Sequence, residues 1–311
     1  EAIYNFLKKK IKKKFTFVNN LKPEISTENK NKILNLIISK SGNTLETITN
    51  SNILIKNKDK NIFILEKNNS YLNILAKKLK SEVIEHNNFI GGRYSVLSEV
   101  GMLPAELMGL NQKKFRQFND LIKNKKFINN LLINVSYTVN LIKRGKFNSI
   151  ILNYDEKSDS FFKWYQQLLA ESLGKKAKGI LPIVSTMPQD NHSLMQLYLD
   201  GPKKTFFTFF YVFDQSHKIK NKNLLSSHSY LKNKSINKII YSQKQATERV
   251  FHDKKIPFRS FEIFKRSEQS LGELFCFFIL ETILLGRALK VNPFDQPAVE
   301  LIKTKTKKIL I

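Results

Sequence analysis

The stretch from Ile33 to Asn50, ILNLIISKSGNTLETITN, constrains the fold more than any other part of this 311-residue chain. It begins with an apolar run rich in β-branched residues, which is typical of a buried parallel strand. The run ends in the hydroxyl-rich turn Ser39–Thr44, and a helical pattern follows with Thr44 as candidate N-cap. Backbone N–H groups and a helix dipole at such a turn attract an anion, most readily a phosphate. An ordinary βα turn with a good cap explains these residues equally well.

Candidate strands and helices continue to alternate around this stretch. Asn61–Leu65 and Glu82–Glu85 predict strands, and Tyr71–Leu79 between them predicts an amphipathic helix. Alternation of this kind indicates a parallel sheet covered by helices. Nearer the N-terminus, Ala2–Lys14 has a helical pattern and Phe15–Val18 is a short candidate strand.

A second alternating series follows the lysine- and asparagine-rich segment Lys113–Lys146. Its predicted strands are Phe147–Tyr154, Ile180–Val184, Lys203–Phe213 and Phe258–Phe264, and its predicted helices are Ser160–Leu173, a run that His192 begins, Gln269–Leu289 and a final helix carrying Lys303. The chain therefore has two α/β parts.

Cysteine content and apolar runs limit the class of protein. The single cysteine, Cys276, excludes a disulfide within the chain and indicates a buried thiol in a reducing compartment. The longest apolar run, Leu271–Leu285, is interrupted by Glu273 and Glu281 and is shorter than the roughly 20 residues that cross a bilayer. We expect a soluble cytoplasmic protein that has no membrane partner.

A formal net charge of +27 raises the possibility of nucleic-acid binding. The excess is mostly lysine, scattered in runs such as Lys8–Lys10 and Lys12–Lys14 within a sequence also rich in asparagine and isoleucine. A nucleic-acid binder usually gathers arginines and aromatic residues on one face. The pattern favours solvated surfaces, and we expect no nucleic-acid partner.

A second candidate site segment, GGRYSVLSEVG, begins at Gly91. Gly91 and Gly92 permit close approach of the backbone to a ligand, and Arg93 follows at once. Arginine is a permanent cation with a planar fork of donors, which suits developing negative charge on oxygen. A glycine turn with a surface arginine is the alternative.

Three further polar residues have the character of an active site. Gln167 and Glu171 are four residues apart on one predicted helix and therefore share a face. A carboxylate beside an amide suits a general base next to a group that orients the substrate, although such pairs usually lie on the surface. His192 is the one of five histidines that follows a strand at the start of a helix. No His, Cys or carboxylate spacing typical of a metal site is present.

Six motifs carry a resemblance that covers nearly the whole chain: ISKSGNTLET, GGRYSVLSEVG, QQLLAESLGK, NHSLMQLYLDGP, LGELFCFFILET and VNPFDQPAVELIK. In these motifs and their order the chain resembles the glucose-6-phosphate isomerase family in its bacterial form. The resemblance implies an α/β fold of two sugar-isomerase (SIS) domains, each a parallel sheet wrapped by helices, and a C-terminal helical tail. The implied domains are residues 1–115, 116–290 and 291–311, with the boundary between the first two near residues 110–125.

The resemblance also implies which residues bind the substrate. Residues of the Ser39–Thr44 loop bind the sugar phosphate. Gly92 lies against the substrate, Gln167 orients it, and Gln296 borders the sugar. The implied phosphate-binding residues are Ser39, Lys40, Ser41 and Thr44.

Four catalytic roles follow from the same resemblance. Glu171 is the general base and Arg93 stabilises the enediolate. His192 opens the sugar ring together with Lys303, and it acts in the active site of the partner subunit of a homodimer. The implied reaction interconverts glucose 6-phosphate and fructose 6-phosphate through a cis-enediol, as in glycolysis and gluconeogenesis, and it needs no cofactor or metal.

Two features depart from the family. A Gly-Ile-Gly-Gly-Ser type turn precedes this part of complete members, and we therefore expect the chain to be the C-terminal part of an isomerase. The approach to His192, Ser185–Asn191, differs from the Gly-Thr type of many members. A dual phosphoglucose/phosphomannose isomerase and a non-catalytic sugar-phosphate-binding protein are the alternative functions.

Overall fold

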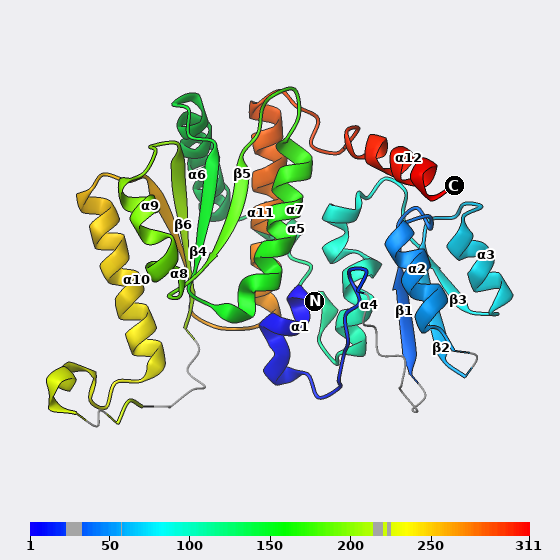
Figure 1. The fold of residues 1–311 in the computed structure, drawn as a ribbon, viewed down its shortest axis with the longest axis horizontal. Coiled ribbons are helices and arrows are strands. Elements are labelled where there is room, and N and C mark those ends of the chain that lie inside the picture. Colours follow the sequence, from blue (N-terminus) through cyan, green and yellow to red (C-terminus); the bar gives the residue numbers. More distant parts are fainter. Residues whose placement is uncertain (23–32, 57, 214–219, 223–224) are drawn as a thin grey trace. The chain divides into compact units, whose positions relative to one another are not determined.

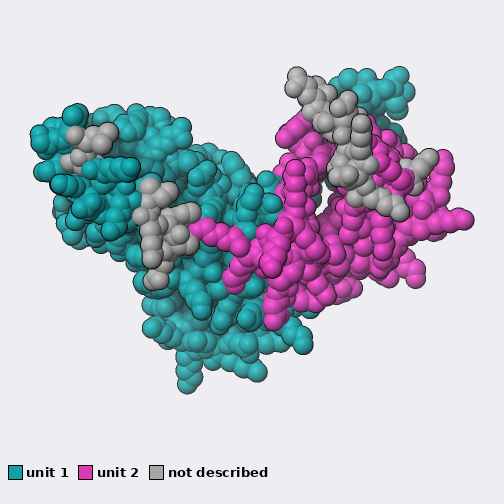
Figure 2. Space-filling view, turned by 90° about the horizontal axis from the view of Figure 1, so that it is seen from below, with its two compact units in different colours: residues 1–8, 113–311 teal, residues 9–112 magenta. Residues whose placement is uncertain are grey.

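The computed structural model describes residues 1–22, 33–56, 58–213, 220–222 and 225–311. These form two compact units, marked in Figure 2: a smaller unit of residues 9–112 and a larger unit of residues 1–8 and 113–311. The first helix belongs to the larger unit because its apolar side chains pack against helix α7 (Asp159–Leu173). The division into domains at residues 115 and 290 stays a prediction.

The smaller unit has a parallel sheet with the strand order β1-β2-β3 (Figure 1). Its elements are β1 (Leu34–Ile38), α2 (Leu45–Leu54), β2 (Lys60–Leu65), α3 (Tyr71–Lys78), β3 (Glu82–Glu85), the 3₁₀ helix η2 (Gly92–Leu97) and α4 (Glu99–Leu107). Strand β2 lies between the other two strands, and all its residues except the first are buried. Its Phe63 and Leu65 pack with Leu72 and Ala76 of α3. Burial on both faces is the reason that this strand has a continuous apolar run.

The larger unit has a four-stranded parallel sheet with the order β5-β4-β6-β7. Its strands are β4 (Asn148–Asn153), β5 (Leu181–Thr186), β6 (Thr205–Val212) and β7 (Phe258–Ile263). Its helices are α1 (Ala2–Leu7), α5 (Phe118–Leu121), α6 (Lys125–Lys143), α7 (Asp159–Leu173), α8 (Asp190–Ser193), α9 (Met195–Asp200), α10 (Ile236–Asp253), α11 (Glu268–Ala288) and α12 (Val299–Leu310). It also has short 3₁₀ turns at Glu156–Ser158 and Ser226–Leu231, and two more, Lys8–Lys10 and Gln112–Lys114, span the division between the units.

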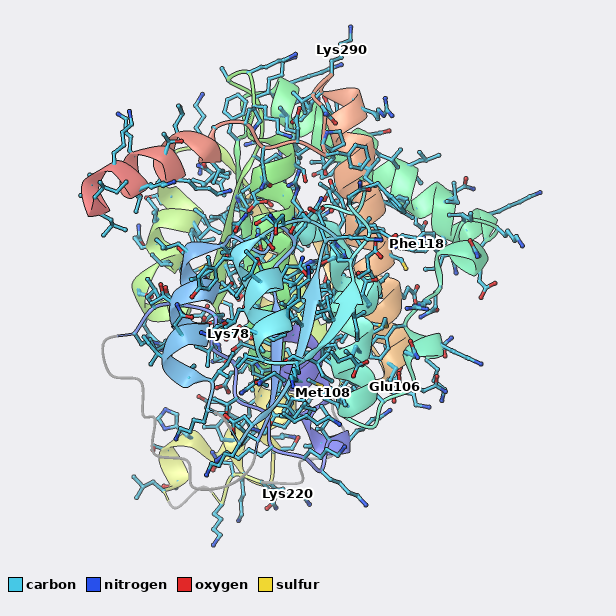
Figure 3. The ribbon with its side chains drawn as sticks, turned by 90° about the vertical axis from the view of Figure 1, so that its right-hand side faces the viewer. Lys78, Glu106, Met108, Phe118, Lys220 and Lys290 are labelled. Atoms are coloured by element: carbon cyan, nitrogen blue, oxygen red, sulfur yellow. The ribbon has the colours of Figure 1, made fainter. Side chains whose placement is uncertain are left out.

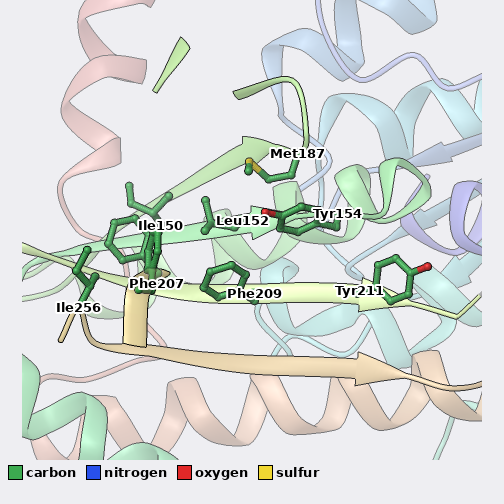
Figure 4. Close-up of a cluster of buried hydrophobic side chains, with 9 residues drawn as sticks. Ile150, Leu152, Tyr154, Met187, Phe207, Phe209, Tyr211 and Ile256 are labelled. Carbon is green, nitrogen blue, oxygen red and sulfur yellow. The ribbon is translucent and has the colours of Figure 1, made fainter. Parts of the chain in front are cut away.

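Aromatic side chains dominate the core of the larger unit. One cluster, shown in Figure 4, lies beside the central strands and contains Phe207 and Phe209 of β6, with Phe251 of α10 packed edge-on against both. Strand β6 pairs with β4 on one side and β7 on the other, so that seven of its eight residues are buried. Cys276 of α11 is fully buried, as the sequence indicates, and burial raises the pKa of its thiol to about 11.

The α/β class and the two parallel sheets are confirmed. The strand expected at Phe15–Val18 is wrong, because a strand needs a neighbour for its hydrogen bonds and the described sheet of this unit consists of β1, β2 and β3. The first helix ends at Leu7, followed by the 3₁₀ turn Lys8–Lys10, and does not reach Lys14. Repeated lysines one turn apart repel each other, which opposes helix in this segment.

Among the described residues, no helix has both the length and the apolar composition needed to cross a membrane.

Candidate active site

The turn after β1 has the geometry expected of an anion site. The buried hydroxyl of Ser39 lies 2.9 Å from the hydroxyl of Thr44, which occupies the N-cap position of α2. The Thr44 side chain does not bond to the first turn of the helix, so it is an N-cap by position and not by side-chain hydrogen bond. The turn therefore places two hydroxyl groups at the N-terminus of a ten-residue helix.

Two residues hold this turn in shape. Gly42 has φ of +68°, and a Cβ atom there would lie 2.0 Å from the hydroxyl of Ser70, so the turn requires glycine on both counts. Lys40 turns its ammonium group to the carbonyl of Asn88, 2.8 Å away, and to the carboxylate of Glu66, 3.4 Å away. Lys40 thus links the Ser39–Thr44 turn to the segment after β3.

Gly92 and Arg93 belong to the same unit, in the 3₁₀ helix η2. Arg93 is 4% exposed, and its guanidinium lies over the ring of Tyr94, 5.3 Å from the centroid. At Gly92 a Cβ would meet nothing within 4 Å, so the structure gives no steric reason for this glycine. The later glycine of the motif, Gly101, does have one, because its Cβ would lie 1.9 Å from the carbonyl oxygen of Val96.

In the larger unit, Gln167 and Glu171 meet on α7. The side-chain amide of Gln167 donates to a carboxylate oxygen of Glu171 at 3.0 Å, and Leu168 and Leu169, which lie between them in the sequence, are buried. The amide fixes the carboxylate one turn away, as the spacing of four residues predicts.

His192 lies in the short helix α8 after β5, and its side chain is exposed. Asp190 holds the turn: its carboxylate accepts from the Ser185 hydroxyl (2.7 Å), the Thr186 N–H (2.8 Å) and the Ser193 hydroxyl (2.8 Å). Burial alone raises the pKa of Asp190, but these hydrogen bonds outweigh it and hold the pKa below its usual range. The helix expected to start at His192 is instead broken at Leu194 into α8 and α9.

Gln296 and Lys303 lie beyond α11, where both residues are exposed. The segment before them is anchored to the loop after α7, because Lys175 forms an ion pair with Asp295 (2.8 Å) and Lys178 donates to the carbonyl of Leu289 (3.0 Å). Nothing in the sequence marks Lys175 and Lys178 for this role, since a lysine that pairs with a nearby carboxylate or backbone carbonyl looks like any surface lysine.

The site residues thus fall into two groups. In the smaller unit, Lys40 ties the Ser39–Thr44 turn to the backbone of Asn88, four residues before Gly92, and in the larger unit Gln167 contacts Glu171. His192, Gln296 and Lys303 also belong to the larger unit. Their assignment to one reaction stays a prediction.

Parallel sheets wrapped by helices, with a hydroxyl-lined turn after a strand, define an α/β protein of the sugar-isomerase (SIS) type. A solved structure with this fold, a glucose-6-phosphate isomerase from Chlamydia trachomatis, aligns with a TM-score of 0.74 over 99% of this chain and 66% of its own, at 19% identity.

Sequence comparison identifies the family. The phosphoglucose isomerase family model matches residues 3–311, and the chain belongs to this family. A probable glucose-6-phosphate isomerase of Methanococcus maripaludis is 33% identical over 86% of this chain and 64% of its own length. A glucose-6-phosphate isomerase of Methanocaldococcus jannaschii is 32% identical over 91% of this chain and 74% of its own length. The chain thus spans between three fifths and three quarters of these two relatives, and the family inferred from the motifs is confirmed.

Proposed function

We propose that the protein is an aldose–ketose isomerase that interconverts glucose 6-phosphate and fructose 6-phosphate. The observation that carries the proposal is the hydrogen bond of Gln167 to Glu171 on α7, in a chain of the phosphoglucose isomerase family. A proton transfer between neighbouring carbons needs one carboxylate held in a fixed direction, and this pair provides it.

The substrate phosphate binds at the Ser39–Thr44 turn. The hydroxyls of Ser39, Ser41 and Thr44 donate to its oxygens, and the N-terminus of α2 adds a favourable dipole. Lys40 contributes its charge from the edge of the turn, where Glu66 and the Asn88 carbonyl hold its ammonium group. Gly92, Gln167 and Gln296 border the sugar.

The chemistry then takes two stages. His192 and Lys303 move a proton between the ring oxygen and the anomeric hydroxyl, which opens the ring. Glu171 removes the proton from the carbon next to the carbonyl and returns it to the adjacent carbon, through a cis-enediol. Arg93 balances the negative charge that develops on oxygen in this intermediate. No step requires a metal or a cofactor.

Phosphate recognition is tested by thermal stability. At one hundred times its Kd, 6-phosphogluconate is expected to stabilise the folded protein by about 2.7 kcal/mol, which raises the Tm by about 5 °C. The double variant Ser41→Ala/Thr44→Ala should lose most of this shift, because it removes two donors to a charged ligand. Thr49→Ala, on the same helix α2, is the matched control and should keep it.

The result that would contradict this proposal is tight binding of nucleic acid by the lysines on the surface. Exposed lysines such as Lys78, Lys220 and Lys290, labelled in Figure 3, come from separate segments of the chain. Duplex DNA should therefore bind weakly at physiological salt. Submicromolar DNA affinity under those conditions, with no stabilisation by any sugar phosphate, contradicts the proposed function.

The proposal includes a cytoplasmic homodimer in which His192 serves the partner's site. Mixing His192→Ala subunits with Glu171→Gln subunits should then restore about a quarter of the wild-type rate, because half of the dimers form between unlike subunits and each of these has one intact site. Fructose 6-phosphate isomerisation in a coupled dehydrogenase assay measures the recovery. Unlike dimers without activity would show that each site is built from one chain. The same assay with mannose 6-phosphate tests for dual specificity.

A further inference from the structure

A buried histidine that the proposed reaction does not use lies in the same unit as Arg93. His86 directly follows β3, and its side chain is 1% exposed. Its backbone N–H donates to the carbonyl of Leu65 at 2.8 Å, which continues the pairing of β2 and β3 by one residue. The sheet therefore fixes the position from which the imidazole extends.

Both ring nitrogens of His86 contact oxygen atoms that accept hydrogen bonds. Nδ1 lies against a carboxylate oxygen of Glu99, in the first turn of α4, and Nε2 lies 3.1 Å from the carbonyl oxygen of Ile90. A neutral imidazole has one N–H and donates to only one of the two, whereas an imidazolium donates to both. A ring that donates to both oxygens is the imidazolium, which would have the Glu99 carboxylate as its counter-ion.

These two contacts close the segment that carries Arg93. Glu99 is 13 residues from His86 along the chain, and Ile90 directly precedes the two glycines. Within the closed segment, the hydroxyl of Ser95 donates to the carbonyl of Gly92 at 2.6 Å. The backbone around Arg93 is thus fixed both by its own turn and by the histidine at its base.

The same segment is also tied to the phosphate loop. Lys40 donates to the carbonyl of Asn88 at 2.8 Å, only two residues from the Ile90 carbonyl that faces His86. The turn between His86 and Gly91 is therefore held at two neighbouring carbonyls, one by a lysine of the loop and one by the buried imidazole.

We propose that His86 and Glu99 form a charged clamp that positions Arg93 for the reaction; this rests on the proposed function. His86 is a positioning residue, because it contacts the segment and not the substrate. The ion pair links the buried imidazole of His86 to the partly exposed carboxylate of Glu99, across the segment that carries Arg93. Its consequence is a fixed path for the backbone on both sides of the guanidinium.

The charge state of the clamp is measured by NMR on the ¹⁵N-labelled 311-residue chain at neutral pH, without any variant. Both ring nitrogens of His86 should carry protons. In Glu99→Gln the ring should revert to a single proton, and the Nε–Hε signal of Arg93, assigned with Arg93→Lys, should shift and exchange faster with water. A neutral His86 ring in the wild-type protein, or an unchanged Arg93 signal in the variant, overturns the proposal.

Kinetics separate positioning from packing. Glu99→Gln should lower kcat for fructose 6-phosphate about 10- to 100-fold by misplacing Arg93, with KM little changed because the phosphate loop is intact. His252→Gln, which alters a histidine whose side chain is 84% exposed, should match the wild-type protein. An unchanged kcat in Glu99→Gln overturns the positioning role. The wild-type protein could fail to isomerise fructose 6-phosphate while Glu99→Gln still changes the NMR signals of His86 and Arg93. In that case the proposed function fails, and the clamp that holds Arg93 stands.

Discussion

Replacing Glu171 by glutamine is expected to abolish isomerisation and to leave binding of 6-phosphogluconate nearly intact. The amide of Gln167 can still donate to a side-chain oxygen at this position, so the helix face keeps its hydrogen bond. What disappears is the only group in the proposed mechanism that takes a proton from carbon. Loss of a general base costs at least about 10²- to 10⁴-fold in rate.

The measurement is conversion of fructose 6-phosphate to glucose 6-phosphate with a coupled dehydrogenase. Glu273→Gln, which makes the same chemical change at an exposed position of α11, is the matched control and should be as active as wild type. More than about a tenth of the wild-type rate in Glu171→Gln would rule out this residue as the base.

The parts of the fold that follow from local pattern were predictable. The apolar run at Leu34–Ile38, the turn and the helix from Leu45 are set by residues within one short stretch, and the structure has all three. The strand at Phe15–Val18 failed for the opposite reason. Its alternating residues are compatible with a strand, but the hydrogen bonds of a strand come from a neighbour that the local sequence does not specify.

In the candidate site, too, some features follow from the local sequence and others depend on residues far away in the chain. The pairing of Gln167 with Glu171 follows from helical spacing, and the structure confirms that the two side chains touch. The partner of the Thr44 hydroxyl does not follow, because capping and a bond to Ser39 compete and tertiary geometry decides between them. His86 gave no signal beyond its place at the end of a predicted strand, since its partner Glu99 lies in another element.

Glu281 shows most clearly which contacts cannot be predicted from the sequence. In the sequence it is only an interruption of an apolar run, whereas in the structure it is fully buried and in contact with Arg259 of β7, 22 residues earlier. Tyr165 of α7, 116 residues away, donates to its second carboxylate oxygen at 2.9 Å. A charge inside an apolar helix implies a partner, but the sequence does not say which of the many arginines and lysines it is.

Arg259 is surrounded by acceptors as well as by Glu281. Its guanidinium donates to the Thr208 hydroxyl at 2.9 Å and to the side-chain oxygen of Asn134 at 2.8 Å. Burial alone lowers the pKa of Arg259, but the adjacent Glu281 carboxylate outweighs it, so the guanidinium stays charged. Burial, reinforced by Glu281, raises the pKa of Tyr165, whose hydroxyl therefore stays protonated. The network joins α6, α7, β6, β7 and α11 through these side chains.

Glu281→Gln is therefore expected to destabilise the larger unit by about 3–5 kcal/mol, because Arg259 is left as a buried charge without a counter-ion. The double variant Arg259→Met/Glu281→Met removes both charges and should recover most of this loss, since apolar residues of similar volume replace a buried pair at little cost. Urea unfolding, followed by the fluorescence of Trp164 on α7, measures the free energy of unfolding for each variant. Two results would show that Arg259 and Glu281 are not energetically coupled. One is a Glu281→Gln variant as stable as wild type, and the other is a double variant no more stable than Glu281→Gln.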